Sequence, residues 1–322
     1  QGGNVPEAFG TGNPLPPSPA KPAIQPFAER FNLEAEINVP EHRYGPVERQ
    51  ALLAEDAERA QYSRVGRMGI NRDVLIQLED GQWHDVPGGQ LWTADIVSEG
   101  AFGLRIGFIG MDLDPDGELL VYAPGDREQA VGGPYPQHGY FDEGEAWTRT
   151  FWGERARIEY FRPTPEQGAE TSENPFVISQ IHHWYRNPFK AVREANQGRG
   201  GAATGNLSCV DDVACHPDWA DVADAVGLIT WPSGQCTGQL LATSNGDLTP
   251  YFLTANHCVS SEFDANNAEI FWFFQNTSCN GTVGFSPSST VATMVDNACA
   301  ADHSLLLIRG ELRNDVYWAA WA

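Results

Sequence analysis

The segment Tyr251-Phe252-Leu253-Thr254-Ala255-Asn256-His257-Cys258-Val259 decides how the whole chain is interpreted. Its aromatic and apolar start is typical of a strand, and this strand leads directly into His257 and Cys258. A single histidine beside a cysteine is more often a core or turn residue than a catalytic group. A second motif changes the balance, because Asp302 stands at the head of the apolar run 305–307, 45 residues after His257.

The two motifs suit one type of chemistry. A serine hydroxyl is a poor nucleophile, so a positioned imidazole must take its proton, and a carboxylate must hold the imidazole's tautomer. In this order, Thr-Ala-x-His-Cys and Asp-x-[Ser/Ala]-Leu-Leu resemble segments of the chymotrypsin-like serine proteases. The resemblance implies that His257 is the general base and that Asp302 orients it. Those proteases usually have a small residue where Asn256 stands.

Over residues 205–322 the resemblance narrows to the bacterial lysyl endopeptidases. They share a Cys-x5-Cys element at 209–215, a Cys-Thr-Gly strand before the histidine and an aromatic strand ending in Gln-Asn-x-x-Cys at 279. In such proteases a second barrel supplies a Gly-Asp-Ser-Gly segment with the nucleophile, and these 322 residues contain no such segment. Ser233 precedes the histidine in an expected hairpin turn. The nucleophile is therefore expected on a second barrel outside this chain, missing or separate, and the chain alone is expected to be inactive.

Cysteine placement predicts disulfides and an oxidising compartment, because six cysteines without a CxxC pair do not fit a zinc site. All six lie after residue 206: Cys209, Cys215, Cys236, Cys258, Cys279 and Cys299. The family resemblance implies a Cys236–Cys258 bridge beside the base and a Cys215–Cys279 bridge. It pairs the cysteine that matches Cys209 with the second barrel. Cys209 and Cys299 stay unassigned, and a bridge between them is one alternative.

Composition argues against several other classes of function. A formal charge of −23, from 43 acidic and 20 basic residues, argues against a nucleic-acid partner. No apolar run approaches the roughly 20 residues of a membrane-spanning helix. No metal or cofactor is predicted. Asp112-Leu113-Asp114-Pro115-Asp116-Gly117 imitates an EF-hand start, but Ala123 occupies the twelfth position, so an acidic turn is the favoured interpretation.

The predicted fold is all-β: a β-sandwich-like prodomain followed by the first antiparallel barrel of a chymotrypsin-like protease. Four segments are expected: a partly helical arm (1–66, with a helix in 46–61), the sandwich (67–189), a linker (190–206) and the barrel (207–322). Strands are predicted at 73–79, 89–97, 102–111, 117–123, 156–163, 176–186, 225–231, 237–243, 249–255, 269–276 and 303–312. Within the 176–186 strand, His182 and His183 should face opposite sides, one packed and one exposed.

By resemblance, residues before 206 form a propeptide and the linker carries a processing site. Lys190, Arg193 and Arg199 are the candidates, and the only lysines of the chain are Lys21 and Lys190. The first hypothesis is a secreted trypsin-like endopeptidase zymogen that cuts proteins or peptides after Lys or Arg. The alternative is a protease-derived, inactive binding or structural protein without a second barrel.

Overall fold

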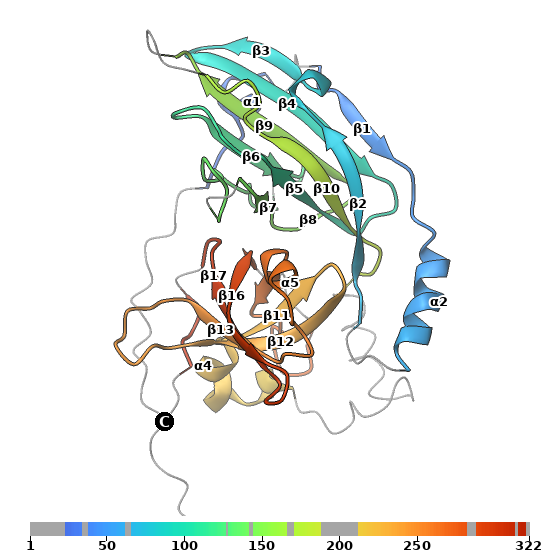
Figure 1. Cartoon of the computed structure of the whole chain (residues 1–322), viewed down its shortest axis with the longest axis vertical. Helices are drawn as coiled ribbons and strands as arrows, with labels where there is room; N and C mark the ends of the chain where they lie inside the picture. Colours follow the sequence, from blue (N-terminus) through green and yellow to red (C-terminus); the bar gives the residue numbers. More distant parts are fainter. Residues whose placement is uncertain are drawn as a thin grey trace, which may run out of the picture. The chain divides into compact units, whose positions relative to one another are not determined.

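The computed structural model describes residues 23–33, 38–61, 66–126, 128–141, 144–165, 171–187, 212–281, 288–312 and 315–319. These residues fall into two compact units, one within Lys21–Asn187 and the other within Pro188–Ala322. Strands dominate both units (Figure 1), so the predicted all-β class is confirmed. No helix among the described residues is long and apolar enough to cross a membrane.

The N-terminal unit contains two five-stranded sheets. The first has the order β1-β4-β9-β6 with β3 on β4, and only the β1–β4 pair is parallel. The second has the order β2-β10-β5-β7 with β8 on β5. The strands of the first sheet are β1 (Glu41–Tyr44), β3 (Gln82–Val86), β4 (Gly89–Ser98), β6 (Glu118–Tyr122) and β9 (Arg155–Pro163). Those of the second are β2 (Gly69–Ile76), β5 (Gly103–Ile109), β7 (Ala146–Trp147), β8 (Phe151–Trp152) and β10 (Val177–Trp184).

One hydrophobic core lies between these sheets. Both contribute alternate buried residues, such as Trp92 and Ala94 from β4 and Leu104 and Ile106 from β5. Phe176 is the centre of the packing, because Trp92, Phe108 and Tyr160 all meet its ring edge-to-face. Alternate residues of each strand point to the same face, so two sheets with such patterns bury one face each in a sandwich.

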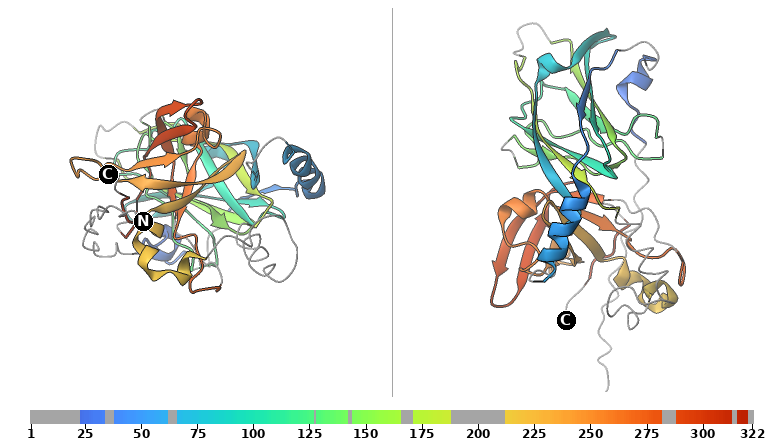
Figure 2. Two further views of the ribbon diagram at one scale, coloured as in Figure 1. Left: turned by 90° about the horizontal axis from the view of Figure 1, so that it is seen from below. Right: turned by 90° about the vertical axis from the view of Figure 1, so that its right-hand side faces the viewer.

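Residues before 67 also take part in the sandwich. The short helix α1 (Phe27–Arg30) covers the other face of the first sheet (Figure 2), where Phe27 stacks on Phe161 with ring centroids 5.2 Å apart. The backbone N–H of Phe27 donates to the buried Glu159 carboxylate at 2.6 Å. Burial of Glu159 raises the pKa of its carboxyl group. The second helix, α2 (Arg49–Arg59), lies within the range predicted as helical.

The EF-hand-like loop has an internal role. The Asp114 side chain is buried and accepts hydrogen bonds from the Tyr160 hydroxyl (2.6 Å), Arg162 Nε (2.6 Å) and the Ser172 backbone N–H (2.7 Å). These donors engage both oxygens of Asp114 and link the turn between β5 and β6 to β9 and to Ser172.

Both histidines of β10 are buried, so the expectation that one would be exposed is wrong. His182 is 3% exposed and lies edge-to-face with Trp184, while His183 is fully buried and its Nδ1 is 2.8 Å from Ser98 Oγ. The two rings still lie on opposite sides of the strand. The sequence of β10 could not predict that both histidines are buried, because alternation along a strand does not show which segment covers the second face of its sheet.

Acidification is expected to destabilise the N-terminal unit through His183. Burial and the nearby Arg72 lower the pKa of His183 to about 4, whereas a histidine in the unfolded chain titrates near 6.5. The unfolded state therefore binds a proton that the folded state rejects. Neutral His183 therefore contributes to the free energy of unfolding, fully above about pH 6.5. This contribution, about 3 kcal/mol, is lost as the pH falls towards 4.

Urea denaturation at a series of pH values measures this effect. His183→Gln should reduce the pH dependence between 6.5 and 4 without abolishing it, because burial also lowers the pKa of His182. The matched control is His138→Gln, because the His138 side chain is 51% exposed. An unchanged slope in His183→Gln would show that other groups control the acid response.

The C-terminal unit is one seven-stranded antiparallel sheet in the order β15-β14-β11-β12-β13-β17-β16. Val291 interrupts residues 288–298 with a φ of 52°, which divides one bent stretch into β15 and β16. Its first part pairs with β14 and its second part with β17, so the stretch joins both edges and curls the sheet into a barrel. The strands are β11 (Val226–Trp231), β12 (Gly234–Leu241), β13 (Tyr251–Thr254), β14 (Glu269–Trp272), β15 (Ser288–Thr290), β16 (Ala292–Ala298) and β17 (His303–Ile308). Short helices are α4 (Ala220–Ala223) and α5 (Glu262–Asn266).

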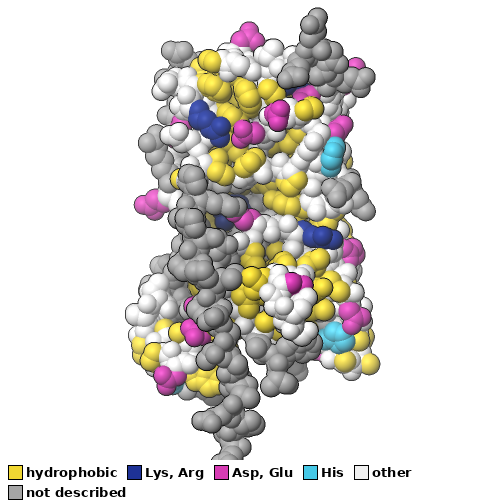
Figure 3. All heavy atoms as spheres, turned by 90° about the vertical axis from the view of Figure 1, so that its left-hand side faces the viewer, with side chains coloured by type: hydrophobic (Ala, Val, Ile, Leu, Met, Phe, Trp, Pro, Cys, Tyr) yellow, Lys and Arg dark blue, Asp and Glu magenta, His cyan; other side chains and the backbone are white. Residues whose placement is uncertain are grey.

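Acidic side chains dominate the charged surface. Figure 3 shows many Asp and Glu side chains and few Lys or Arg side chains on the face that it draws, as expected from the net charge of −23.

Candidate active site

The pairing of β13 with β17 brings His257 and Asp302 to one edge of the barrel. The two strands run antiparallel in a register that places Thr254 opposite Ser304. His257 follows the end of β13, and Asp302 immediately precedes β17. Because the end of one strand meets the start of the other, residues 45 positions apart in the sequence become neighbours.

The carboxylate of Asp302 contacts both the ring and the backbone of His257. Its Oδ2 lies 2.8 Å from His257 Nδ1, and its Oδ1 accepts the His257 backbone N–H at 2.9 Å. The His257 backbone N–H, followed by its ring, lowers the pKa of the Asp302 carboxyl group. A carboxylate in this position favours the tautomer with the proton on Nδ1, which leaves Nε2 to accept a proton from another group.

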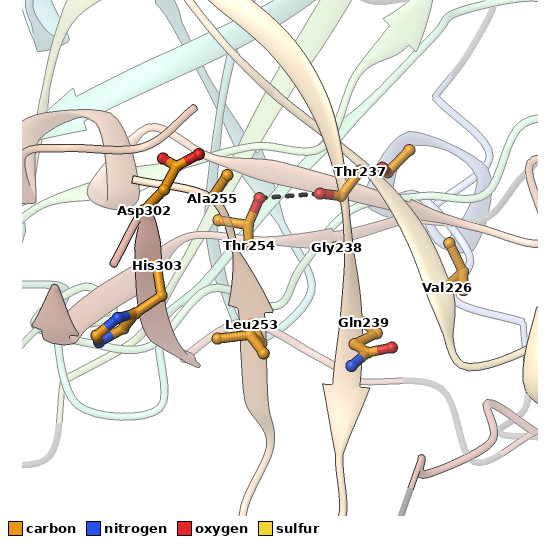
Figure 4. A pocket seen from close by; sticks show the side chains of 9 residues that line it. All are labelled: Val226, Thr237, Gly238, Gln239, Leu253, Thr254, Ala255, Asp302 and His303. Carbon is orange, nitrogen blue, oxygen red and sulfur yellow. Dashed lines mark hydrogen bonds between the residues drawn. The ribbon is translucent and has the colours of Figure 1, made fainter. Parts of the chain in front are cut away.

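The backbone around the pair is constrained. Asp302 has a φ of 48°, in the left-handed region that Asp adopts more readily than most residues. Next to His257, Cys258 is bonded to Cys236 of β12. The hydroxyl of Thr254 also donates to the Thr237 carbonyl at 2.9 Å (Figure 4). These links tie the turn that carries His257 to β12 as well as to β17.

Disulfides join the two cysteine pairs that the resemblance implies, Cys215–Cys279 and Cys236–Cys258. Cys299 is exposed and forms no disulfide with another described cysteine, while Cys209 lies outside the described residues. The sulfurs of Cys236 and Cys258 lie close to the His257 ring. They are not metal ligands here, because both are consumed in the disulfide.

A depression of about 390 Å³ lies beside Asp302. Its lining comes from β11, β12, β13 and the start of β17: Val226, Thr237, Gly238, Gln239, Leu253, Thr254, Ala255, Asp302 and His303. Figure 4 shows the Asp302 carboxylate at one end and the His303 ring directed away from it. The side chains of His257 and Asp302 are 53% and 54% exposed, so the pair is open to solvent.

Two further residues connect the same segments. Asn256 is 9% exposed and Ser304 is fully buried, and the Asn256 amide donates to the Ser304 hydroxyl. The sequence offered one signal for the first of them, since Asn256 replaces a small residue of the resembled proteases. Nothing in the sequence singled out Ser304. Ser233 lies in the turn between β11 and β12, where the sequence predicted a hairpin turn.

The processing candidates Lys190, Arg193 and Arg199 lie outside the described residues. The structure therefore brings His257 together with Asp302 and joins the two cysteine pairs, and it leaves the linker positions as sequence predictions.

An antiparallel barrel with a His–Asp pair at one edge is similar to the first barrel of the trypsin-like serine proteases. Residues 203–322 match the family described as lysyl endopeptidase, C-terminal domain. Over 271 residues the chain is 22% identical to the lysyl endopeptidase of Pseudomonas aeruginosa, an alignment covering 77% of this chain and 55% of that protein. The chain is thus lysyl endopeptidase-like, and it spans about half the length of that relative.

Proposed function

We propose that this chain is part of a secreted trypsin-like serine endopeptidase precursor. The observation that carries the proposal is the contact of Asp302 Oδ2 with His257 Nδ1 at 2.8 Å, at the position where two family-like motifs meet. The likeness to lysyl endopeptidases over residues 203–322 supports the same reaction class.

In the proposed reaction, His257 Nε2 takes the proton of a serine hydroxyl as the oxygen attacks the scissile carbonyl. The same nitrogen then delivers the proton to the leaving amine. Asp302 stays ionised, holds the proton on Nδ1 and stabilises the imidazolium that forms. A second barrel outside these 322 residues supplies the serine, the oxyanion donors and the specificity pocket.

The N-terminal sandwich is the proposed propeptide of this zymogen. Cleavage in the 190–206 segment, after Lys190, Arg193 or Arg199, would separate it from the barrel. The substrates are proteins or peptides with Lys or Arg before the cut bond. Two disulfides in the barrel support folding in an oxidising, extracellular compartment.

Fluorophosphonate labelling of the purified protein, read by intact mass under non-reducing conditions, tests the proposal. A labelled species heavier than this chain, or a labelled companion polypeptide, is the expected result because the probe reacts with an activated serine. His257→Ala should abolish the label. Substrate profiling at Lys and Arg then identifies the preferred residue.

The alternative is an inactive protein with a binding or structural role. The open depression and the half-exposed His–Asp pair would then form part of a contact surface. Absence of label, with a mass that matches 322 residues and intact disulfides, would favour this alternative.

A further inference from the structure

Asn256 stands where the resembled chymotrypsin-like proteases usually have a small residue. It directly precedes His257, and its side chain is 9% exposed. A buried amide without hydrogen bonds costs folding free energy, so a polar side chain in place of a small one needs a partner in the interior. The hydrogen-bond partner of the Asn256 amide therefore indicates which segments this side chain connects.

That partner is Ser304 of β17, which lies opposite Thr254 at the end of β13. Asn256 Nδ2 donates to Ser304 Oγ at 3.4 Å, and the Ser304 hydroxyl donates to the Val259 carbonyl at 2.6 Å. Ser304 and Val259 are both fully buried. One hydroxyl thus accepts from the residue before His257 and donates to the residue two positions after it.

Ser304 is also close to the other half of the pair. It lies two residues after Asp302, on the strand β17 that Asp302 immediately precedes, and its neighbour across the ladder is Thr254. The chain of contacts from Asn256 through Ser304 to Val259 therefore fixes the His257 turn to the segment that carries Asp302. The imidazole itself is 53% exposed, so its own packing does little to hold its orientation.

We propose that Asn256 is a positioning residue that, through Ser304, holds the His257 ring against Asp302. This inference rests on the proposed role of His257 as general base. Asn256 touches no reacting atom. It acts by keeping Nδ1 within hydrogen-bond distance of the carboxylate, which selects the tautomer with the proton on Nδ1.

Long-range ¹H–¹⁵N NMR of the full chain, at a pH where His257 is neutral, measures the two tautomers of its ring. In Asn256→Ala the population ratio of the Nδ1–H to the Nε2–H tautomer should fall about three- to tenfold, the range expected for loss of one buried hydrogen bond. Ser304→Ala removes the shared hydroxyl with little change in volume and should give the same shift. It replaces Asn256→Ala in the experiment if that variant folds poorly.

Asn267→Ala is the matched control. Asn267 is also buried in this unit, and its amide donates to the Phe263 carbonyl at 2.8 Å, away from His257. Its loss should lower stability and leave the tautomer ratio unchanged. A wild-type ratio in folded Asn256→Ala and Ser304→Ala, or an equal shift in Asn267→Ala, would overturn the proposal. The measurement needs no serine, so a failed labelling experiment is separable from a failed tautomer shift.

Discussion

Asp302→Asn is expected to lower kcat by about 10⁴-fold in the proposed peptidase, with little change in KM. The carboxylate accepts the Nδ1 proton of His257 at 2.8 Å. An amide in its place can present an N–H to the ring, which favours the tautomer that blocks Nε2. The general base is then lost although the fold is kept. Steady-state kinetics on a Lys or Arg peptide substrate measure the effect.

Asp296→Asn is the matched control for that experiment. Asp296 also pairs with a histidine, since its Oδ2 lies 3.1 Å from His303 Nε2, and its side chain is 69% exposed. We expect kcat within about twofold of the wild type, because exposed ion pairs contribute little. A loss in Asp302→Asn of less than tenfold would contradict the triad role.

Asp95→Ala is expected to lower the free energy of unfolding of the N-terminal unit by about 3–5 kcal/mol. The Asp95 side chain is 2% exposed, and both its oxygens accept hydrogen bonds from Arg157, at 2.7 and 2.9 Å. Arg155 adds a third contact at 2.7 Å. Removal of the carboxylate leaves the guanidinium of Arg157, 17% exposed, without its counter-charge.

Urea denaturation followed by tryptophan fluorescence measures this loss. Asp85→Ala is the matched control, because Asp85 is an exposed acid on β3 of the same sheet and, among the described residues, accepts a hydrogen bond only from the Gln90 amide. Its cost should stay within about 0.5 kcal/mol. Equal denaturation midpoints for the two variants would show that the ion pairs of Asp95 with its arginines contribute no more to the free energy of unfolding than an exposed carboxylate does.

The solvent exposure of the His257–Asp302 pair weakens the electrostatic attraction within it. At about half exposure, solvent screens the attraction between the Asp302 carboxylate and a protonated imidazole. A partner surface over the depression beside Asp302 would lower the local dielectric and strengthen that attraction. In the proposed peptidase the second barrel provides such a cover, so the pair reaches full effect only in the assembled enzyme.

The sequence alone predicted most of the strands and singled out His257 and Asp302, which the structure brings into contact. Apolar alternation placed β4, β5, β9 and β11 within a few residues, because side-chain period reports which face of a strand is buried. The motifs at His257 and Asp302 were readable because the strand that positions each of them adjoins it in the sequence.

Only the tertiary structure decided the remaining features. The addition of β1 and α1 to the sandwich, the burial of both His182 and His183, and the contact of Asn256 with Ser304 all depend on segments far apart in the chain. Local patterns record how a residue relates to its neighbours along the strand. They do not record which other segment covers its second face, and that long-range choice gives Asn256 its partner.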